Sequence, residues 1–302
     1  MTSNSPAERR MLLVHAHPDD ETIATGVTMA RYLAEGVQVT LVTCTRGEEG
    51  EVLVPSLEHL AAKQQDGLGD HRERELAAAM KILGVVDQRY LGGPGAYRDS
   101  GMMGEPSNDR PECFWRADLL EAASHLVSVV REVRPQVLVT YDFFGQYGHP
   151  DHIQAHRVAM YAQTLAAVPT FRPDLGAPWD TPKVYWTALP KSFVQRGVDA
   201  FVAAGGKGFF GLDEGDELPW ANEDSEVTSE IRGLEYEPLK MAALRAHETQ
   251  VEQEGDFFAF SEMVGPEAMG TEFFRIVKGQ LGALNESGRE TDLFSEITSE
   301  RR

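Results

Sequence analysis

The sequence predicts an α/β protein, a Rossmann-like three-layer sandwich with a mostly parallel sheet and a smaller C-terminal elaboration. Over the first 170 residues, short apolar runs rich in β-branched residues alternate with segments that have helical spacing. The first strand, helix and strand follow one another within residues 11–44. A unit of this kind requires parallel strands joined by a right-handed crossover.

Each element of the first 170 residues has its own signal. Apolar residues recur at helical spacing over 22–35, and Gly36 then stops the helix. Residues 37–44 are rich in β-branched side chains, and another helix ends before Pro135. The expected strands are 11–15, 37–44, 88–91 and 136–141, and the expected helices are 22–35, 70–83, 117–133 and 151–166.

The alternation breaks after residue 171, where four prolines occur within twenty residues. We expect a strand at 183–189 and a helix at 237–247 in this part. The predicted organisation is one compact domain with four parts: a flexible N-terminus (1–10), a catalytic core (11–170), an elaboration that completes the pocket (171–282) and a polar tail (283–302). Residues 211–230 carry eight acidic side chains and no Lys or Arg, which suits a solvated loop or a lid over a site.

Composition excludes several functional classes. The 302 residues include 28 Lys and Arg against 48 Asp and Glu, a net charge of −20, which argues against nucleic acid and anionic membranes as partners. The longest apolar run near the N-terminus, residues 11–14, is too short to span a membrane. Cys44 and Cys113 form no CxxC pair and suit reduced thiols. We therefore expect a cytoplasmic protein that acts on a small molecule; oligomeric state is left open.

Two motifs rich in His and Asp follow predicted strands. The stretch after the first strand contains neither GxGxxG nor GxxxxGK[ST], which argues against nucleotide binding. It reads HAHPDDE over 15–21, and YGHPDH over 147–152 follows the strand 136–141. Ligand sites of open parallel sheets lie beyond the carboxyl ends of the strands, so the two motifs are expected to converge on one site.

The residue types in these motifs suit a catalytic metal. Two imidazoles and one carboxylate are a common catalytic zinc set that leaves positions open for water and substrate, and Fe²⁺ accepts the same donors. His17 and Asp20 are three residues apart, as are His149 and His152, so one histidine of the second pair can bind metal while the other faces substrate. Asp19 is placed either to deprotonate water or to cap the first helix.

HAHPDDE with a later HPDH resembles the LmbE-type, PIG-L-type metal-dependent deacetylase superfamily. The resemblance runs from about residue 11 to 294 and thins over 170–235. Further segments are similar to the branch that acts on N-acetylglucosaminyl-inositol in mycothiol biosynthesis. They are TCT (43–45), GEEGEV (47–52), LGG (91–93), YRDSGM (97–102) and VTYD (139–142).

The resemblance implies a role for each matching position. The metal ligands would be His17, Asp20 and His152, with one divalent ion, Zn²⁺ or else Fe²⁺. Asp19 would be the general base, His149 would stabilise the oxyanion and help protonate the leaving amine, Asp151 would tune His149, and Tyr147 would polarise the acetyl carbonyl. The substrate-binding positions would be Glu51, Arg72, Arg98 and Asp99. From the residues alone, Arg98 could instead pair with a carboxylate, and Arg72 could form a surface ion pair with Glu73 or Glu75.

The implied reaction is removal of acetyl from 1-O-(2-acetamido-2-deoxy-α-D-glucopyranosyl)-1D-myo-inositol. Two alternatives stay open: an amidase that cleaves mycothiol S-conjugates, and a non-catalytic, metal-dependent sugar-binding protein. The presence of both Asp19 and His149 argues against the second alternative. The sequence departs from the superfamily pattern at Phe143-Phe144-Gly145-Gln146, which bears on the pocket wall and on the freedom of Tyr147 to move.

Overall fold

A computed structural model describes residues 9–203, 205, 220–252 and 256–297. Its centre is a seven-stranded sheet in the order β3-β2-β1-β4-β5-β7-β6. The strands are β1 (Arg10–His15), β2 (Gln38–Thr43), β3 (Asp87–Tyr90), β4 (Val137–Thr140), β5 (Lys183–Ala188), β6 (Ser229–Arg232) and β7 (Thr271–Lys278). Neighbouring strands from β3 to β5 pair in parallel, whereas β7 is antiparallel to both β5 and β6. The predicted α/β class with a mostly parallel sheet is confirmed.

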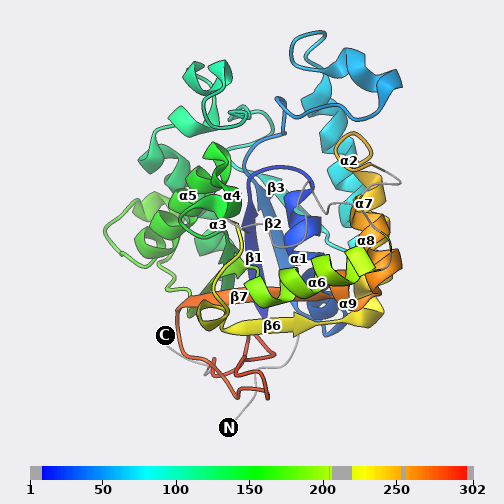
Figure 1. Ribbon diagram of the computed structural model, residues 1–302. Helices are drawn as coiled ribbons and strands as arrows, with labels where there is room; N and C mark the ends of the chain where they lie inside the picture. The colour runs from blue at the N-terminus through cyan, green and yellow to red at the C-terminus, as the bar shows by residue number, and fades with distance from the viewer. Residues whose placement is uncertain (1–8, 204, 206–219, 253–255, 298–302) are drawn as a thin grey trace.

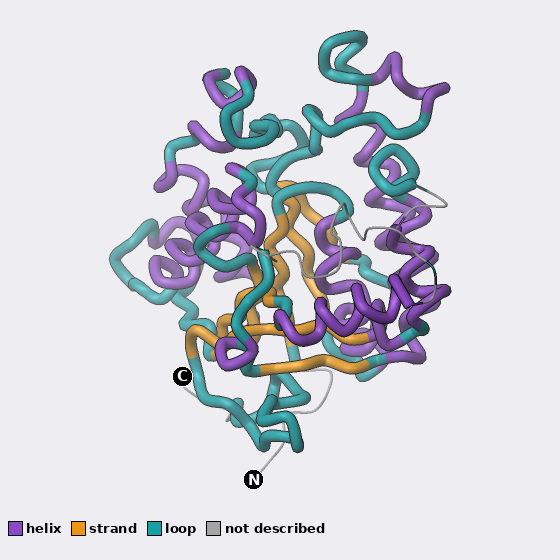
Figure 2. Tube along the Cα trace, viewed as in Figure 1, coloured by secondary structure: helices purple, strands orange, loops and turns teal. Residues whose placement is uncertain are grey.

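Helices cover both faces of the sheet (Figures 1 and 2). In Figure 1, α3 and α5 lie on the left of the strands, and α1, α2 and α7 lie on the right. The helices are α1 (Asp20–Ala34), α2 (Leu68–Leu83), α3 (Leu119–Val133), α4 (Gly145–Gly148), α5 (Pro150–Ala166), α6 (Lys191–Ala203), α7 (Glu237–Ala246), α8 (Asp256–Val264) and α9 (Glu267–Gly270). Short 3₁₀ turns lie at Pro55–Leu60, Pro106–Asp109, Phe114–Arg116, Pro173–Leu175, Asp224–Glu226 and Leu234–Tyr236.

The side chains of β1 contribute to two core clusters, one on each face of the sheet. Met11 and Leu13 pack into the cluster beneath α1 and α2, whereas Leu12 and Val14 pack into the cluster beneath α3 and α5. All four side chains are fully buried. Because successive side chains of a strand point to opposite faces, a central strand covered on both faces is apolar throughout. The apolar MLLV run is therefore typical of a strand in the centre of the sheet.

The segment expected to be a polar tail is packed onto the sheet. Leu293 is fully buried in the core cluster beneath α1 and α2. Glu290 is also fully buried: its carboxylate accepts hydrogen bonds from Lys183 Nζ at 3.0 Å and from the Tyr185 hydroxyl at 2.5 Å. The expectation of a tail is thus wrong for residues 284–297, because two residues of β5 require this carboxylate as their partner. The division of the chain near residue 170 stays a prediction.

The elements after β5 include several that the sequence analysis did not predict, namely α6, β6, α8, α9 and β7. Of the acidic segment 211–230, residues 211–219 lie outside the described residues, and the rest contains β6 and a 3₁₀ turn. Within the described ranges, no helix is both long and apolar enough to cross a membrane.

Candidate active site

The two His/Asp motifs meet where the strand order reverses. β1 and β4 are adjacent in the sheet, although the chain leaves β1 toward β2 and β3 and continues from β4 toward β5 on the other side. HAHPDDE follows β1, and YGHPDH forms the end of α4 and the start of α5 after β4. A crevice at the carboxyl ends of two such strands is the usual ligand site of an open α/β sheet.

Two candidate histidine ligands flank the carboxylate oxygen of the third, Asp20. His17 Nδ1 and His152 Nε2 each lie 3.3 Å from Asp20 Oδ2. Ligand atoms about 2.0–2.1 Å from a tetrahedral zinc ion are separated from one another by about 3.3 Å. His152 is fully buried and His17 is 7% exposed. The donor types and these two separations therefore suit a divalent metal at His17, Asp20 and His152. His17 and His152 also form a potential metal-binding group with His149, in which the ligand atoms all lie within 4.8 Å of one another.

The charges around these donors favour a cation. Burial lowers the pKa of His17, but the nearby Asp99, Asp151 and Asp20 carboxylates more than offset this and raise it well above its ordinary value. Burial raises the pKa of Asp20, but the His152 and His17 imidazoles outweigh it and hold that pKa well below its usual range. A site that keeps a carboxylate charged and favours a proton on its histidine attracts positive charge.

Tyr141 holds Asp20 in place and was missed by the sequence analysis. Its hydroxyl donates to Asp20 Oδ2 at 2.8 Å and accepts from the Ala16 N–H, also at 2.8 Å. Its ring stacks on His152 with centroids 4.2 Å apart. Its position directly after β4 was a signal, because a residue there points into the same crevice as the two motifs.

Asp19 lies beside the donor set in an uncommon backbone conformation, with φ 111°. Asp19 occupies the N-cap position of α1, and its carbonyl accepts the N–H groups of Thr22 and Ile23, but its side chain makes no capping bond. Asp19 Oδ2 instead accepts from Arg72 Nη2 at 3.0 Å. Burial raises the Asp19 pKa to about 6, and Arg72 counteracts part of that shift. A carboxyl group that titrates near neutral pH suits a general base.

A buried pair behind Asp19 connects to its backbone. The Asp19 N–H donates to Glu21 Oε2 at 2.9 Å, and His247 Nε2 lies 3.2 Å from Glu21 Oε1. Glu21 and His247 are both fully buried. The sequence analysis did not single out this pair, since its members are 226 residues apart in the chain.

His149 and Asp151 are arranged differently from the expectation. His149 Nδ1 accepts the Asp151 backbone N–H at 3.1 Å, which directs Nε2 away from the helix. The Asp151 carboxylate accepts from the Ser100 N–H at 2.9 Å and lies 3.2 Å from His17 Nε2. Among the described residues, Asp151 therefore orients His17 through its side chain and contacts His149 through its backbone.

Named proteins resemble this chain in sequence over nearly its whole length. The family model described as PIG-L, GlcNAc-PI de-N-acetylase, matches residues 12–163, a range that contains both motifs. A protein of Geodermatophilus obscurus named 1D-myo-inositol 2-acetamido-2-deoxy-alpha-D-glucopyranoside deacetylase is 59% identical over 288 residues, which cover 95% of this chain and 97% of the relative. The chain belongs to the PIG-L family. The resemblance seen in the sequence is confirmed.

Proteins of this fold with solved structures differ in the reactions that their names state. An N,N'-diacetylchitobiose deacetylase from Pyrococcus horikoshii aligns with a TM-score of 0.60 at 19% identity, covering 90% of this chain and 84% of its own. A 4-carboxy-2-hydroxymuconate hydratase from Pseudomonas putida also aligns with a TM-score of 0.60, at 18% identity, covering 92% and 99%. The fold alone therefore does not determine the reaction, and the argument for function rests on the site.

A polar cavity of about 820 Å³ opens at the candidate metal ligands of this PIG-L family member. Ionisable side chains line it, namely His17, Asp19, Asp20, Glu49, Glu51, Lys63, Arg72, Asp99, Glu105, Arg110 and His149. Tyr147 lies at its edge, 47% exposed, with its hydroxyl 3.4 Å from His152 Nε2. Burial raises the pKa of the Tyr147 phenol above its ordinary value, which keeps the hydroxyl protonated as a donor.

The four expected substrate-binding residues differ in their positions. Glu51, Arg72 and Asp99 line the polar cavity. Arg98 does not line it among the described residues and instead pairs with Glu49 at 2.8 Å and Asp66 at 2.6 Å, the carboxylate alternative considered above. Arg72 is only 3% exposed and bonds to Asp19 and to the Gly47 and Pro18 carbonyls, so the surface ion pair is wrong.

The unusual stretch 143–146 lies next to the site. Phe143 and Phe144 are exposed at 65% and 49% and lie outside both described cavities. Gln146 has φ 63°, and its Nε2 donates to Thr187 Oγ1 at 3.1 Å. This bond belongs to the wall of a second, apolar cavity. Gly145 of the same stretch packs against His152, since a Cβ there would lie 2.6 Å from the His152 Cβ, so the departure from the superfamily pattern adjoins one candidate metal ligand.

Proposed function

We propose that this chain is a metal-dependent N-deacetylase that hydrolyses the acetyl group of 1-O-(2-acetamido-2-deoxy-α-D-glucopyranosyl)-1D-myo-inositol in mycothiol biosynthesis. The observation that carries the proposal is the set of three donors beside Asp19 at the mouth of a large polar cavity. The full-length relative at 59% identity, whose name states this substrate, supports it.

The proposed metal is zinc. The 3.3 Å separations of the donor atoms suit tetrahedral zinc, and Fe²⁺ is the alternative because it accepts the same donors. When bound, such an ion polarises a carbonyl oxygen and lowers the pKa of water from about 15.7 toward about 7.

The chain's own residues supply the remaining chemistry. Asp19, as a carboxylate, takes the proton of the attacking water. The Tyr147 hydroxyl donates to the oxygen of the acetyl carbonyl as negative charge develops there, where a fixed donor is most effective. His149, with Nδ1 fixed by a backbone N–H, presents Nε2 to the same oxygen and to the leaving nitrogen. Acetate and the free amine are the products.

Substrate specificity would come from the polar cavity. A pseudo-disaccharide presents many hydroxyl groups, and each buried hydroxyl needs a hydrogen-bond partner. Glu51, Asp99 and Arg72 line the cavity together with further charged residues. We also propose a cytoplasmic location, because both described cysteines, Cys44 and Cys113, are buried free thiols.

The test measures acetate and amine released from the glycosyl-inositol substrate, with and without chelator, and after adding back Zn²⁺ or Fe²⁺. Turnover that chelator abolishes and metal restores supports the proposal. Asp19→Asn is the matched control, because it keeps the side-chain shape but removes the base and should be inactive with metal bound. Turnover that is indifferent to chelator, or full activity of Asp19→Asn, would contradict it. Release of amine only from a mycothiol S-conjugate would favour the amidase.

A further inference from the structure

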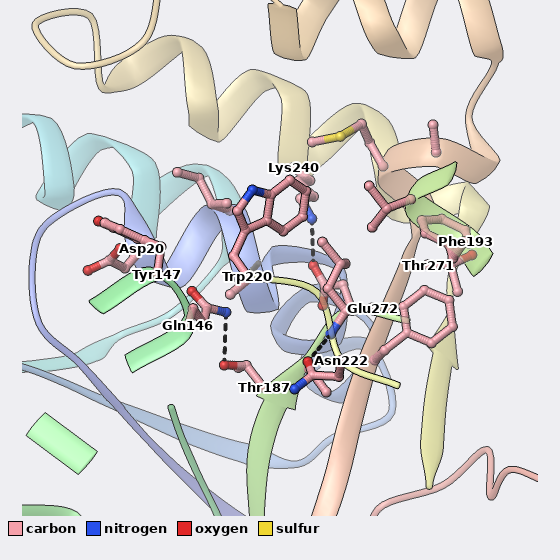
Figure 3. A pocket seen from close by; sticks show the side chains of 18 of the residues that line it. Asp20, Gln146, Tyr147, Thr187, Phe193, Trp220, Asn222, Lys240, Thr271 and Glu272 are labelled. Carbon is pink, nitrogen blue, oxygen red and sulfur yellow. Dashed lines mark hydrogen bonds and ion pairs between the residues drawn. The ribbon is translucent and has the colours of Figure 1, made fainter. Parts of the chain in front are cut away.

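A second cavity, of about 530 Å³, lies against the same catalytic side chains, and His149 is not part of its lining (Figure 3). Asp19, Asp20 and Tyr147 line both cavities, whereas His17, Asp99 and His149 line only the polar one. In Figure 3, Asp20 and Tyr147 lie at one end of the second cavity and Phe193 lies toward the other. Its apolar lining includes Ile23, Leu189, Phe193, Val194, Met269 and Phe273.

Four polar side chains in this lining, Lys240, Glu272, Gln146 and Asn222, already have partners within the protein. Lys240 Nζ pairs with Glu272 Oε1 at 2.8 Å, and the same carboxylate accepts the Val27 and Thr28 N–H groups. Gln146 donates to Thr187, and Asn222 Oδ1 accepts the Leu189 N–H at 2.8 Å. The cavity therefore has the character of an apolar binding site rather than of a site for a sugar or an ion.

An amide substrate has a polar amine part and an acyl part, and the two cavities differ correspondingly in the polarity of their linings. The amine side must lie near His149, the proposed partner of the leaving nitrogen, and hence in the polar cavity. The acyl substituent then points away from His149, past Asp20 and Tyr147, toward the apolar cavity. The methyl of an acetyl group occupies a small part of about 530 Å³.

We propose that the apolar cavity is an acyl-binding site, and that the enzyme also hydrolyses amides of the same glucosaminyl-inositol amine with unbranched acyl chains longer than acetyl. This inference rests on the proposed function. In each reaction the C–N bond breaks, water supplies OH to the acyl carbon and H to the nitrogen, and the products are a straight-chain carboxylic acid and the amine.

Binding of the acid products tests the site without any turnover. Acetate, butanoate and hexanoate are titrated into the metal-loaded protein by calorimetry. Burial of each methylene should raise affinity about fourfold, and the heat-capacity change should become more negative along the series. Equal affinity of the wild-type protein for acetate and hexanoate would overturn the proposal.

Two matched variants locate the effect. Ala268 lines the cavity from α9, and Ala268→Phe should abolish the gain from acetate to hexanoate. Ala78 is exposed on α2, and Ala78→Phe adds the same ring there and should keep the gain. If the gain survives in Ala268→Phe, the cavity is not the acyl site. Should Ala268→Phe fail to melt cooperatively, Phe193→Ala, which enlarges the cavity, should lengthen the longest acid that still gains affinity; no change there would count equally against the proposal.

Hydrolysis of the N-acetyl, N-butanoyl and N-hexanoyl amides completes the test. The wild-type protein should cleave the hexanoyl amide with a KM at least tenfold below that of the acetyl amide, and Ala268→Phe should lose this advantage. Cleavage of the acetyl amide alone overturns the extended substrate range. Cleavage of the hexanoyl amide alone means that the proposed acetyl substrate fails while the acyl site stands. If no amide is cleaved although hexanoate binds more tightly, the proposed function and the extended substrate range fail, and only the apolar site remains.

Discussion

Arg72 holds the carboxylate of Asp19, with Nη2 3.0 Å from Oδ2. The same guanidinium donates to the Gly47 carbonyl at 2.9 Å and to the Pro18 carbonyl. A planar guanidinium holds its donors in a fixed fork, whereas the three donors of an ammonium rotate about a single nitrogen. Arg72 thus fixes both the charge beside the proposed base and the loops on either side of it.

Replacing Arg72 should change the pH dependence of the reaction. In Arg72→Gln the cation that lowers the Asp19 pKa is lost, so the acidic limb of kcat/KM should move to higher pH by about one unit, the equivalent of about 1.4 kcal/mol. Arg72→Lys keeps the charge and should leave the limb near its original position. Identical limbs in the wild type and Arg72→Gln would show that Asp19 does not set the limb.

The wild-type acidic limb itself follows from the burial of Asp19. A base must be deprotonated to act, and burial raises the Asp19 pKa to about 6. In metal-free protein, the Asp19 carboxyl carbon should therefore titrate near pH 6 by NMR. With metal bound the titration should move lower, since a nearby cation stabilises the carboxylate. A titration near 4 in metal-free protein would contradict the argument from burial.

Glu21 should act as a positioning residue for Asp19. Glu21→Leu removes the acceptor of the Asp19 N–H and the partner of His247, so we expect a loss of about 1–3 kcal/mol in the free energy of unfolding. It should also lower kcat more than it raises KM, because the φ of 111° at Asp19 is no longer held. Glu21→Gln keeps an acceptor oxygen and should restore most of kcat. An equal kcat in all three proteins would assign the pair a purely structural role.

Metal binding should depend on His152 and stabilise the fold. A ligand at 100 times its Kd adds about 2.7 kcal/mol to stability, so Zn²⁺ should raise the Tm of the wild-type protein. In His152→Ala the metal content after dialysis and the Tm increase should both fall. His156→Ala is the control from the same helix, since His156 bonds to the Tyr141 carbonyl at 2.9 Å and lines neither cavity. Unchanged metal content in His152→Ala would disprove the ligand assignment.

The Lys183–Glu290 pair should be important for stability and not for catalysis. Both side chains are almost completely buried, so Glu290→Ala leaves an uncompensated charge and should cost about 3–5 kcal/mol in denaturant unfolding. The double variant Lys183→Met with Glu290→Met removes both charges and should recover much of that loss. Activity per folded molecule should stay unchanged in each, which separates this pair from the site.

The sequence predicts the first five strands well because their signals are local. MLLVH and QVLVTY carry the apolar, β-branched character that burial on both faces requires. The sequence analysis did not predict the antiparallel strands β6 and β7, whose pairing joins residues 39 to 45 apart in the chain (271 − 232 and 274 − 229). The packing of 284–297 was missed for a related reason: Glu290 looks solvated until its partners Lys183 and Tyr185 are known.

The site divides in the same way. The sequence predicts three metal ligands because their motifs follow strands, and the structure brings together the ligand atoms of His17, Asp20 and His152. The contacts of Asp151 could not be predicted, because the spacing of residues does not show which neighbour a carboxylate faces, whereas for Arg98 the carboxylate pair was one of the two alternatives. The position of Tyr141 after β4 was a signal for the site, but its bond to Asp20 and the Glu21–His247 pair join residues far apart in the chain, and no local pattern shows such contacts.

The adjacency of β1 and β4 also affects the timing of folding during synthesis. His17 and Asp20 leave the ribosome 135 and 132 residues before His152 (152 − 17 and 152 − 20), so a nascent chain cannot assemble the donor set until α5 has emerged. The ion would therefore bind late, and it would stabilise only those chains in which β4 has already inserted beside β1. Metal supply in the cell then acts on the yield of correctly assembled protein as well as on its turnover.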